Sequence, residues 1–294
     1  MLQSENDILR RVRKIEIKTR GLSNEIFAGK YHTAFRGRGM SFSEVREYRI
    51  GDDVRDIDWN VTARSSKPHI KIYEEERELT MMLVVDVSGS RGFGTTERMK
   101  QNVITEIAAV LAFSAAQNND KVGCIFFSDR VEKFIPPKKG KSHILMIIRE
   151  LISFQPESSR TSISEAVRFL TGVSKKRCTT FILSDFMNSR RDKAALEDAL
   201  KIAGSKHDLV GIRVWDRREA ELPDVGIIEL EDAETGRKEW VDTSSARVRE
   251  HYAQSWAQRN EEVEELLKRN RIDSAMISTE GDYVAELIKL FKQR

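Results

Sequence analysis

The chain has 294 residues, of which 39% are hydrophobic and 33% are charged, and its net charge at pH 7 is +3. This length allows one large α/β domain with an appended module, and the composition is that of a globular protein with a heavily charged surface. No run reaches the ~18 uncharged apolar residues that a membrane helix needs, and the first residues lack the pattern of a signal peptide. We therefore expect a cytoplasmic protein without an integral membrane segment.

The first 78 residues are expected to form an N-terminal extension that packs on the main domain. Residues 5–20 have the apolar spacing of a helix, with Ile8, Val12 and Ile15 on one face and basic residues on the other. The first fifty residues carry eleven Lys and Arg against six Asp and Glu. This basic helix face lacks the aromatic residues that stack on bases, so a solvated surface is favoured over nucleic-acid binding.

Residues 37–64 combine paired charges with aromatic residues, and glycines and turn residues separate short extended runs. The favoured interpretation is a network of Arg–carboxylate pairs that holds an irregular segment in place, with Tyr48 and Trp59 as hydrophobic anchors. In this interpretation Asp58, Trp59 and Arg64 are structural residues. A second interpretation, in which some of these charges face a partner, stays open.

From residue 79 onwards, strand and helix patterns alternate. This alternation predicts an α/β domain over 79–294, with a mostly parallel sheet and helices on both faces. The expected strands are 80–86, 122–128, 131–135, 178–184, 208–215 and 272–278, and the expected helices lie near 97–117, 141–153, 162–173, 191–203, 245–269 and 281–292. The first of these helices is expected to bury a stripe formed by Met99, Val103, Ile107, Val110, Leu111 and Ser114. Residues 216–243 interrupt the alternation as an insertion, which is predicted to contain a hairpin.

Oxygen-bearing side chains follow two of the predicted buried strands. The apolar run that starts at Leu83 ends in Asp86, Ser88 and Ser90, and the later run 179–184 ends in Asp185. Because the carboxyl ends of parallel strands meet at one edge of a sheet, these groups are expected to lie close together. Taken alone, the first cluster also fits a turn in which Asp86 caps the next helix and the serines bond locally.

A further hydroxyl group, that of Thr161, lies on a loop before the predicted helix 162–173. The five candidate ligands are Asp86, Ser88, Ser90, Thr161 and Asp185. They form an all-oxygen set with open positions for water, and some of them are expected to act through water rather than directly. Such a set suits Mg²⁺ or Mn²⁺ better than Zn²⁺, which prefers His and Cys.

This arrangement resembles the metal-ion-dependent adhesion site of von Willebrand factor A domains, which use Asp-x-Ser-x-Ser, a loop Thr and a strand-end Asp. The resemblance implies a von Willebrand factor A-like, Rossmann-like fold. Two departures stand out: Ser159-Arg160 precede Thr161 where these domains usually carry glycines, and Phe186 takes the place of a common glycine. Arg160 would either weaken cation binding by repulsion or attract an acidic ligand.

The block FRGRGMSFSEVREYRIGDDVRDIDWNVTAR, residues 35–64, together with the following Asp-x-Ser-x-Ser strand, resembles the bacterial domain-of-unknown-function 58 family. Members of this family are often paired with MoxR-type AAA+ ATPases. The resemblance implies a protein partner, either such an ATPase or its client, and a role in the assembly or maturation of protein complexes. It implies no established catalytic activity.

We therefore expect a metal-dependent protein-interaction module rather than an enzyme. The first alternative is a Mg²⁺-dependent hydrolase or phosphotransferase that uses Asp86. Phosphatases of that kind usually need a second Asp at position 88, where this chain has Ser, and the sequence contains no Gly-x-Ser-x-Gly elbow and no P-loop. Nucleic-acid binding through the basic N-terminal helix is the second alternative.

Overall fold

The computed structural model describes residues 9–10, 12–16, 41–65, 67–74, 79–89, 99–187, 193–231 and 236–294. By its internal contacts the chain divides into two units. The larger unit comprises Met1–Ala34 with Thr80–Arg294, and the smaller unit comprises Phe35–Leu79.

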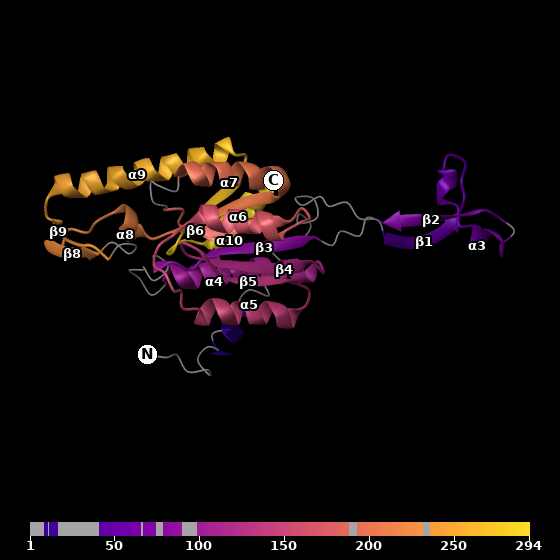
Figure 1. The fold of residues 1–294 in the computed structure, drawn as a ribbon, viewed down its shortest axis with the longest axis horizontal. Coiled ribbons are helices and arrows are strands. Elements are labelled where there is room, and N and C mark those ends of the chain that lie inside the picture. The colour runs from indigo at the N-terminus through magenta and orange to yellow at the C-terminus, as the bar shows by residue number, and fades with distance from the viewer. Residues whose placement is uncertain are drawn as a thin grey trace. The chain divides into compact units, whose positions relative to one another are not determined.

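The larger unit is built on a six-stranded sheet (Figure 1). The strand order is β10-β7-β6-β3-β4-β5, and every neighbouring pair is parallel except the edge pair β4 and β5. These strands are β3 (Thr80–Asp86), β4 (Lys121–Phe127), β5 (Val131–Lys138), β6 (Thr179–Ser184), β7 (Asp208–Trp215) and β10 (Asp273–Ser278). The predicted α/β fold with a mostly parallel sheet is therefore confirmed.

Helices cover both faces of this sheet, as expected. They are α4 (Lys100–Gln117), α5 (Lys141–Ser153), α6 (Ile163–Val173), α7 (Lys193–Lys206), α9 (Ala246–Arg269) and α10 (Tyr283–Gln293). Figure 1 shows α4 and α5 on one side of the strands and α6, α7 and α9 on the other. Met82 and Val84 of β3 share a core cluster with apolar residues of α6, α7 and α9. Within the described residues, no helix has the length and apolar character needed to cross a membrane.

Helix α4 is buried along most of its length, in agreement with the predicted apolar stripe through Val103, Ile107 and Leu111. The prediction that Met99 belongs to this stripe is wrong, because its side chain is 49% exposed. Met99 has extended backbone angles and precedes the helix, so it lies outside the helical period. The inward position at the start of α4 belongs instead to Lys100, which is 1% exposed.

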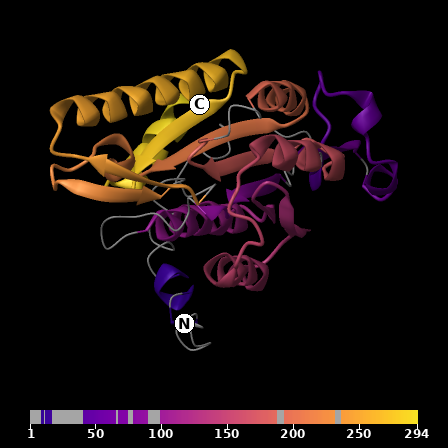
Figure 2. The same cartoon turned by 60° about the vertical axis from the view of Figure 1, so that its left-hand side comes forward.

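The insertion 216–243 contains a short helix, α8 (Arg217–Ala220), and the predicted hairpin, formed by β8 (Ile227–Glu231) and β9 (Lys238–Asp242). Figures 1 and 2 show this hairpin beside the N-terminal end of α9. Helix α8 begins at a capping box: the Asp216 side chain accepts from the backbone of the first turn, and the Glu219 side chain accepts from the Asp216 backbone N–H. This capping box places Glu219 at the carboxyl edge of the sheet, directly after β7.

The N-terminal helix expected at 5–20 is described in part. Residues 9–10 and 12–16 are helical, and Val12 is buried. Glu16 forms an ion pair with Lys141 at the start of α5, which connects this helix to the rest of the larger unit. Ile8, the other end of the predicted apolar face, lies outside the described residues.

The smaller unit is a two-stranded antiparallel sheet of β1 (Ser41–Glu47) and β2 (His69–Glu74), with the single turns η1 (Val54–Asp56) and α3 (Trp59–Thr62) between them. The predicted Arg–carboxylate pairing is present here. Both terminal nitrogens of Arg46 donate to the Asp52 carboxylate, each at 2.8 Å. This bidentate pair connects β1 to the turn that follows it.

Trp59 is not a buried anchor of this unit, so the prediction of its role is wrong. Its side chain is 70% exposed, and Arg64 is exposed as well. The buried position belongs to the neighbouring Asp58, whose carboxylate accepts from the backbone N–H groups of Asn60 and Val61. Asp58 is a structural residue, as expected, because it caps α3.

Candidate functional site

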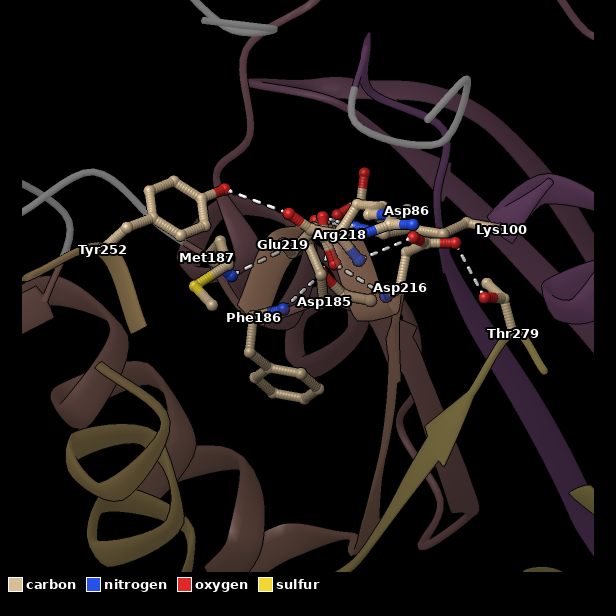
Figure 3. A network of polar contacts seen from close by, with 11 residues as sticks. Asp86, Lys100, Asp185, Phe186, Met187, Asp216, Arg218, Glu219, Tyr252 and Thr279 are labelled. Atoms are coloured by element: carbon tan, nitrogen blue, oxygen red, sulfur yellow. Dashed lines mark hydrogen bonds and ion pairs between the residues drawn. The ribbon is translucent and has the colours of Figure 1, made fainter. Parts of the chain in front are cut away.

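The two predicted carboxylates lie at the ends of neighbouring strands. Asp86 is the last residue of β3, and Asp185 directly follows β6. These strands are parallel and adjacent, with Val85 opposite Leu183, so both chains leave the sheet at the same edge. Figure 3 shows Asp86 and Asp185 in one polar cluster, and the ring of Phe186 points away from it.

Asp86 is 2% exposed, and both of its carboxylate oxygens accept hydrogen bonds. Oδ2 accepts from the Ser184 hydroxyl at 2.6 Å, and Oδ1 accepts from the backbone N–H of Ser88 at 2.9 Å. Burial, and then the negative charge of Asp185, raise the pKa of Asp86 to about 6, although the hydrogen bonds from Ser184 and Ser88 oppose this rise. The site therefore holds two carboxylates that repel each other in a desolvated place.

The loop after β3 brings the Thr161 segment to the same edge. The Gly89 backbone N–H donates to the Ser159 carbonyl at 3.1 Å, and Ser162 N–H donates to the carbonyl of Ser128, the residue after β4, at 2.8 Å. Ser88 and Thr161 are both buried. Four of the five predicted ligands thus belong to segments that meet at one edge, whereas Ser90 lies outside the described residues.

The backbone turns sharply after Asp185. Phe186 has a φ of 57°, in the left-handed region where a glycine carries no steric penalty. This conformation explains why the related pattern favours glycine at this position. In this chain the Phe186 ring is buried in the core cluster, and its N–H donates to the Ser184 hydroxyl at 3.0 Å. The packing of the ring offsets the strain of the turn.

A buried lysine neutralises part of this cluster. The Lys100 ammonium donates to Asp185 Oδ2 at 3.0 Å and forms a second ion pair with Glu219 Oε1. Burial alone would lower the pKa of Lys100, but Asp185 and Glu219 outweigh burial and raise it. Burial has the opposite effect on the acid Glu219: it raises the pKa of Glu219, and the Lys100 charge opposes that rise. Lys100 therefore links the end of β6 to helix α8 as a charged group.

The polar row continues along the edge beyond β6. Asp216, which follows β7, accepts at Oδ2 from the Thr279 hydroxyl at 2.8 Å, and the Thr279 N–H donates to the Trp215 carbonyl at 2.9 Å. Asp216 and Thr279 (Figure 3) thus repeat, at the ends of β7 and β10, the carboxylate–hydroxyl pairing of Asp86 and Ser184. These bonds connect the start of the insertion, at Asp216, to the end of β10 at the same edge of the sheet.

Five residues of this network were given no role from the sequence: Lys100, Ser184, Asp216, Glu219 and Thr279. A signal existed for the first four. Lys100 lies at helical spacing from the apolar residues of α4, and Ser184 directly precedes Asp185 at a strand end. Glu219 lies three residues after Asp216, which is the spacing of a capping box. Only the tertiary structure shows that these residues meet.

The donor set fits a hard divalent cation. Two buried carboxylates and the hydroxyls of Ser88 and Thr161 are oxygen groups of the kind that Mg²⁺ and Mn²⁺ prefer. In the part of the chain that the structure describes, no group of three or more His, Cys, Asp and Glu side chains could hold a metal. The repulsion that raises the pKa of Asp86 is the interaction that a bound cation would relieve.

Comparisons with known proteins identify relatives but no activity. Uncharacterized protein Rv1480 of Mycobacterium tuberculosis and Uncharacterized protein Mb1516 of Mycobacterium bovis are each 27% identical to this chain over 287 residues, which are 96% of this chain and 88% of the relative. Among solved structures, the conserved hypothetical protein BatB from Bacteroides thetaiotaomicron is 15% identical with a TM-score of 0.48, covering 73% of this chain and 98% of that one. The SpRpn10 VWA domain is 9% identical with a TM-score of 0.40, covering 74% and 96%.

A family model also matches this chain, and the match covers most of the sequence. The model described as "Protein of unknown function DUF58" matches residues 44–262. The match spans the Arg46–Asp52 pair, the strand that ends in Asp86 and the insertion that carries Glu219. Since it covers well over half of the sequence, this chain belongs to the DUF58 family.

Proposed function

We propose that this chain is a protein-interaction module that binds its partner at the carboxyl edge of the six-stranded sheet, through a Mg²⁺ or Mn²⁺ ion. The ligands we assign are Asp86, Ser88, Ser90, Thr161 and Asp185. The observation that carries the proposal is the pair of buried carboxylates, Asp86 and Asp185, at adjacent strand ends where buried hydroxyl groups also gather. Packing alone does not require two repelling acids at one place.

Neighbouring residues hold the two candidate carboxylate ligands in fixed orientations. Ser184 and the Ser88 backbone hold the Asp86 carboxylate in a fixed orientation, and the Phe186 turn fixes Asp185. Burial excludes bulk water, which strengthens electrostatic attraction at this edge. A bound divalent cation would supply a coordination position that a carboxylate of the partner fills.

We further propose that the module is not an enzyme. Asp86, the candidate nucleophile of the alternative hydrolase, is 2% exposed, and both of its oxygens accept hydrogen bonds. A carboxylate held in this way is poorly placed to attack a substrate. The partner we propose is a MoxR-type AAA+ ATPase or its client, with a role in the assembly or maturation of protein complexes. Its support is the resemblance of the 35–64 block and the family membership.

The test is capture of the purified MoxR-type ATPase of the same organism by the immobilised native chain, with and without a chelator. Asp86→Ala is compared with Asp198→Ala, which removes an exposed carboxylate on α7. We expect chelator and Asp86→Ala each to abolish capture, and Asp198→Ala to leave it unchanged. Circular dichroism verifies that both variants fold. Undiminished capture by folded Asp86→Ala and in chelator would contradict the proposal.

A further inference from the structure

Lys100 places a fixed positive charge against one of the candidate ligands. Its ammonium donates to Asp185 Oδ2 at 3.0 Å, and its side chain is 1% exposed. The other partner of this ammonium is Glu219, which belongs to α8 in the insertion. Figure 3 shows Lys100 reaching into the cluster that holds both carboxylates. Lys100 thus connects the candidate cation site with the insertion.

The same carboxylate oxygen cannot serve an ammonium and a divalent cation equally well. An ammonium within hydrogen-bond distance takes up part of the negative charge of Asp185 and repels a second cation beside it. Glu219 is already paired with the same ammonium, and its side chain is held in place by the Asp216 backbone N–H at 2.9 Å. The geometry therefore allows Lys100 to keep one partner when it gives up the other.

We propose that Lys100 sets the divalent-cation affinity of this site, as an internal competitor for Asp185 that an entering cation displaces towards Glu219. This inference rests on the proposed function, because it concerns the cation that the function requires. It adds a regulatory residue that is not itself a ligand. It also makes Glu219, and with it the start of the insertion, respond to whether the site is filled.

A variant with unchanged net charge distinguishes competition between Lys100 and the cation for Asp185 from an effect of net charge on cation affinity. Lys100→Met alone would leave two buried carboxylates without their counter-ion, which endangers folding. The double variant Lys100→Met/Glu219→Gln removes one positive and one negative charge. Methionine retains much of the length of lysine, and glutamine retains an oxygen that can accept from the Asp216 N–H. If net charge alone set the affinity, this variant would bind cations as the native chain does.

The experiment is a calorimetric titration of MgCl₂ and of MnCl₂ into the native chain and into this double variant. Lys133→Met/Glu150→Gln is the matched control, because it removes a partly exposed ion pair of 2.6 Å between β5 and α5. We expect the Lys100→Met/Glu219→Gln variant to bind each cation about 10- to 100-fold more tightly than the native chain, the range in which groups around metal ligands change affinity. The control is expected to match the native chain.

A measurement on the native chain makes the proposal independent of whether the variant folds. The ¹⁵N resonance of the Lys100 ammonium, assigned by correlation to the backbone of α4, is followed during the MgCl₂ titration. Displacement from Asp185 predicts a shift that saturates together with the heat of binding. Heat of binding without a shift of this resonance would overturn the inference.

The outcomes distinguish this inference from the proposed function. If the Lys100→Met/Glu219→Gln variant binds cations more tightly than the native chain and the control variant does not, the result supports both this inference and the proposed function. Equal affinities in the folded variant and the native chain overturn the role of Lys100 and leave the metal-dependent interaction in place. Absence of divalent-cation binding in all three chains overturns both proposals.

Discussion

At the scale of single residues, the site depends on the hydrogen bonds and ion pairs that its buried carboxylates form. The Asp86 carboxylate is held by Ser184 and Ser88, Asp185 is paired with Lys100, and Asp216 is bound by Thr279. Except for the bond between Ser88 and Asp86, these contacts join residues that are far apart in the sequence. The cost of burying these acids is offset only while all of the partners are present.

The bond from Ser184 to Asp86 is predicted to stabilise the fold. In Ser184→Ala the buried carboxylate loses a donor at 2.6 Å, and no water can easily replace it. Hydrogen bonds to charged groups contribute about 1.5–3 kcal/mol, so the free energy of unfolding should fall by about that amount. Urea denaturation at neutral pH measures it. Ser153→Ala, at an exposed serine on α5, is the control, and an equal loss in both variants would refute the prediction.

His207 is predicted to make the stability of the fold depend on pH. Burial, and then the charges of Lys206 and Arg177, lower the pKa of His207 below its ordinary value of 6.5. The unfolded chain therefore takes up a proton at a higher pH than the folded chain does. The contribution of His207 to stability is thus complete above pH 6.5 and is lost as the pH drops from there towards the lowered pKa.

The matched variant is His207→Asn, whose side-chain oxygen can accept the hydrogen bond that His207 Nδ1 accepts from the Cys178 N–H. Urea denaturation of both proteins above and below pH 6.5 measures the effect. We expect the native chain to lose more stability on acidification than the variant loses. Parallel losses in the two proteins would show that other groups cause the pH dependence.

The candidate ligands were predictable residue by residue, but their counter-ion was not. A strand that ends in Asp86-x-Ser88 and another that ends in Asp185 can be recognised in the sequence, because parallel strands share an edge. A lysine at the start of a helix, by contrast, is ordinarily solvated. Lys100 is buried because two acids from other segments surround its ammonium, which is a tertiary property.

At the scale of elements, short pieces of structure departed most from expectation. The long strands and helices of the larger unit are present where their periodicity predicts them. Helix α8 was missed because four residues are too few to show a period, although its capping box was visible. Trp59 was expected to be buried, but it begins the one-turn helix α3 and its side chain is 70% exposed.

The exposed position of Trp59 yields a prediction for the smaller unit. Trp59→Ala should change the free energy of unfolding by no more than about 0.5 kcal/mol, as is usual for surface substitutions. Thermal denaturation monitored by circular dichroism measures the effect. A loss of several kcal/mol would show that the indole is buried in solution. Unchanged stability combined with lost partner binding would assign this segment to the interface.

At the scale of the whole molecule, the candidate ligands that the structure describes and their hydrogen-bond partners lie at the carboxyl edge of the six-stranded sheet. The fold class was predictable because alternating strand and helix patterns allow few topologies. The order β6-β3-β4 then places Asp86 between its neighbours, so that loops from both sides reach it. What the sequence could not provide is the coupling of this edge to the insertion through Lys100 and Glu219, since that depends on how α4 and α8 meet.

The most direct test of the central claim is a calorimetric titration of Mn²⁺ into the native chain, Asp86→Ala and Ser88→Ala, with the unfolding temperature of each protein measured in parallel. We predict that the native chain binds Mn²⁺ at millimolar concentration or below, that folded Asp86→Ala does not, and that Ser88→Ala binds about tenfold more weakly or worse while its unfolding temperature changes little. Absence of binding to the native chain at millimolar Mn²⁺, or equal binding by all three proteins, would contradict the account.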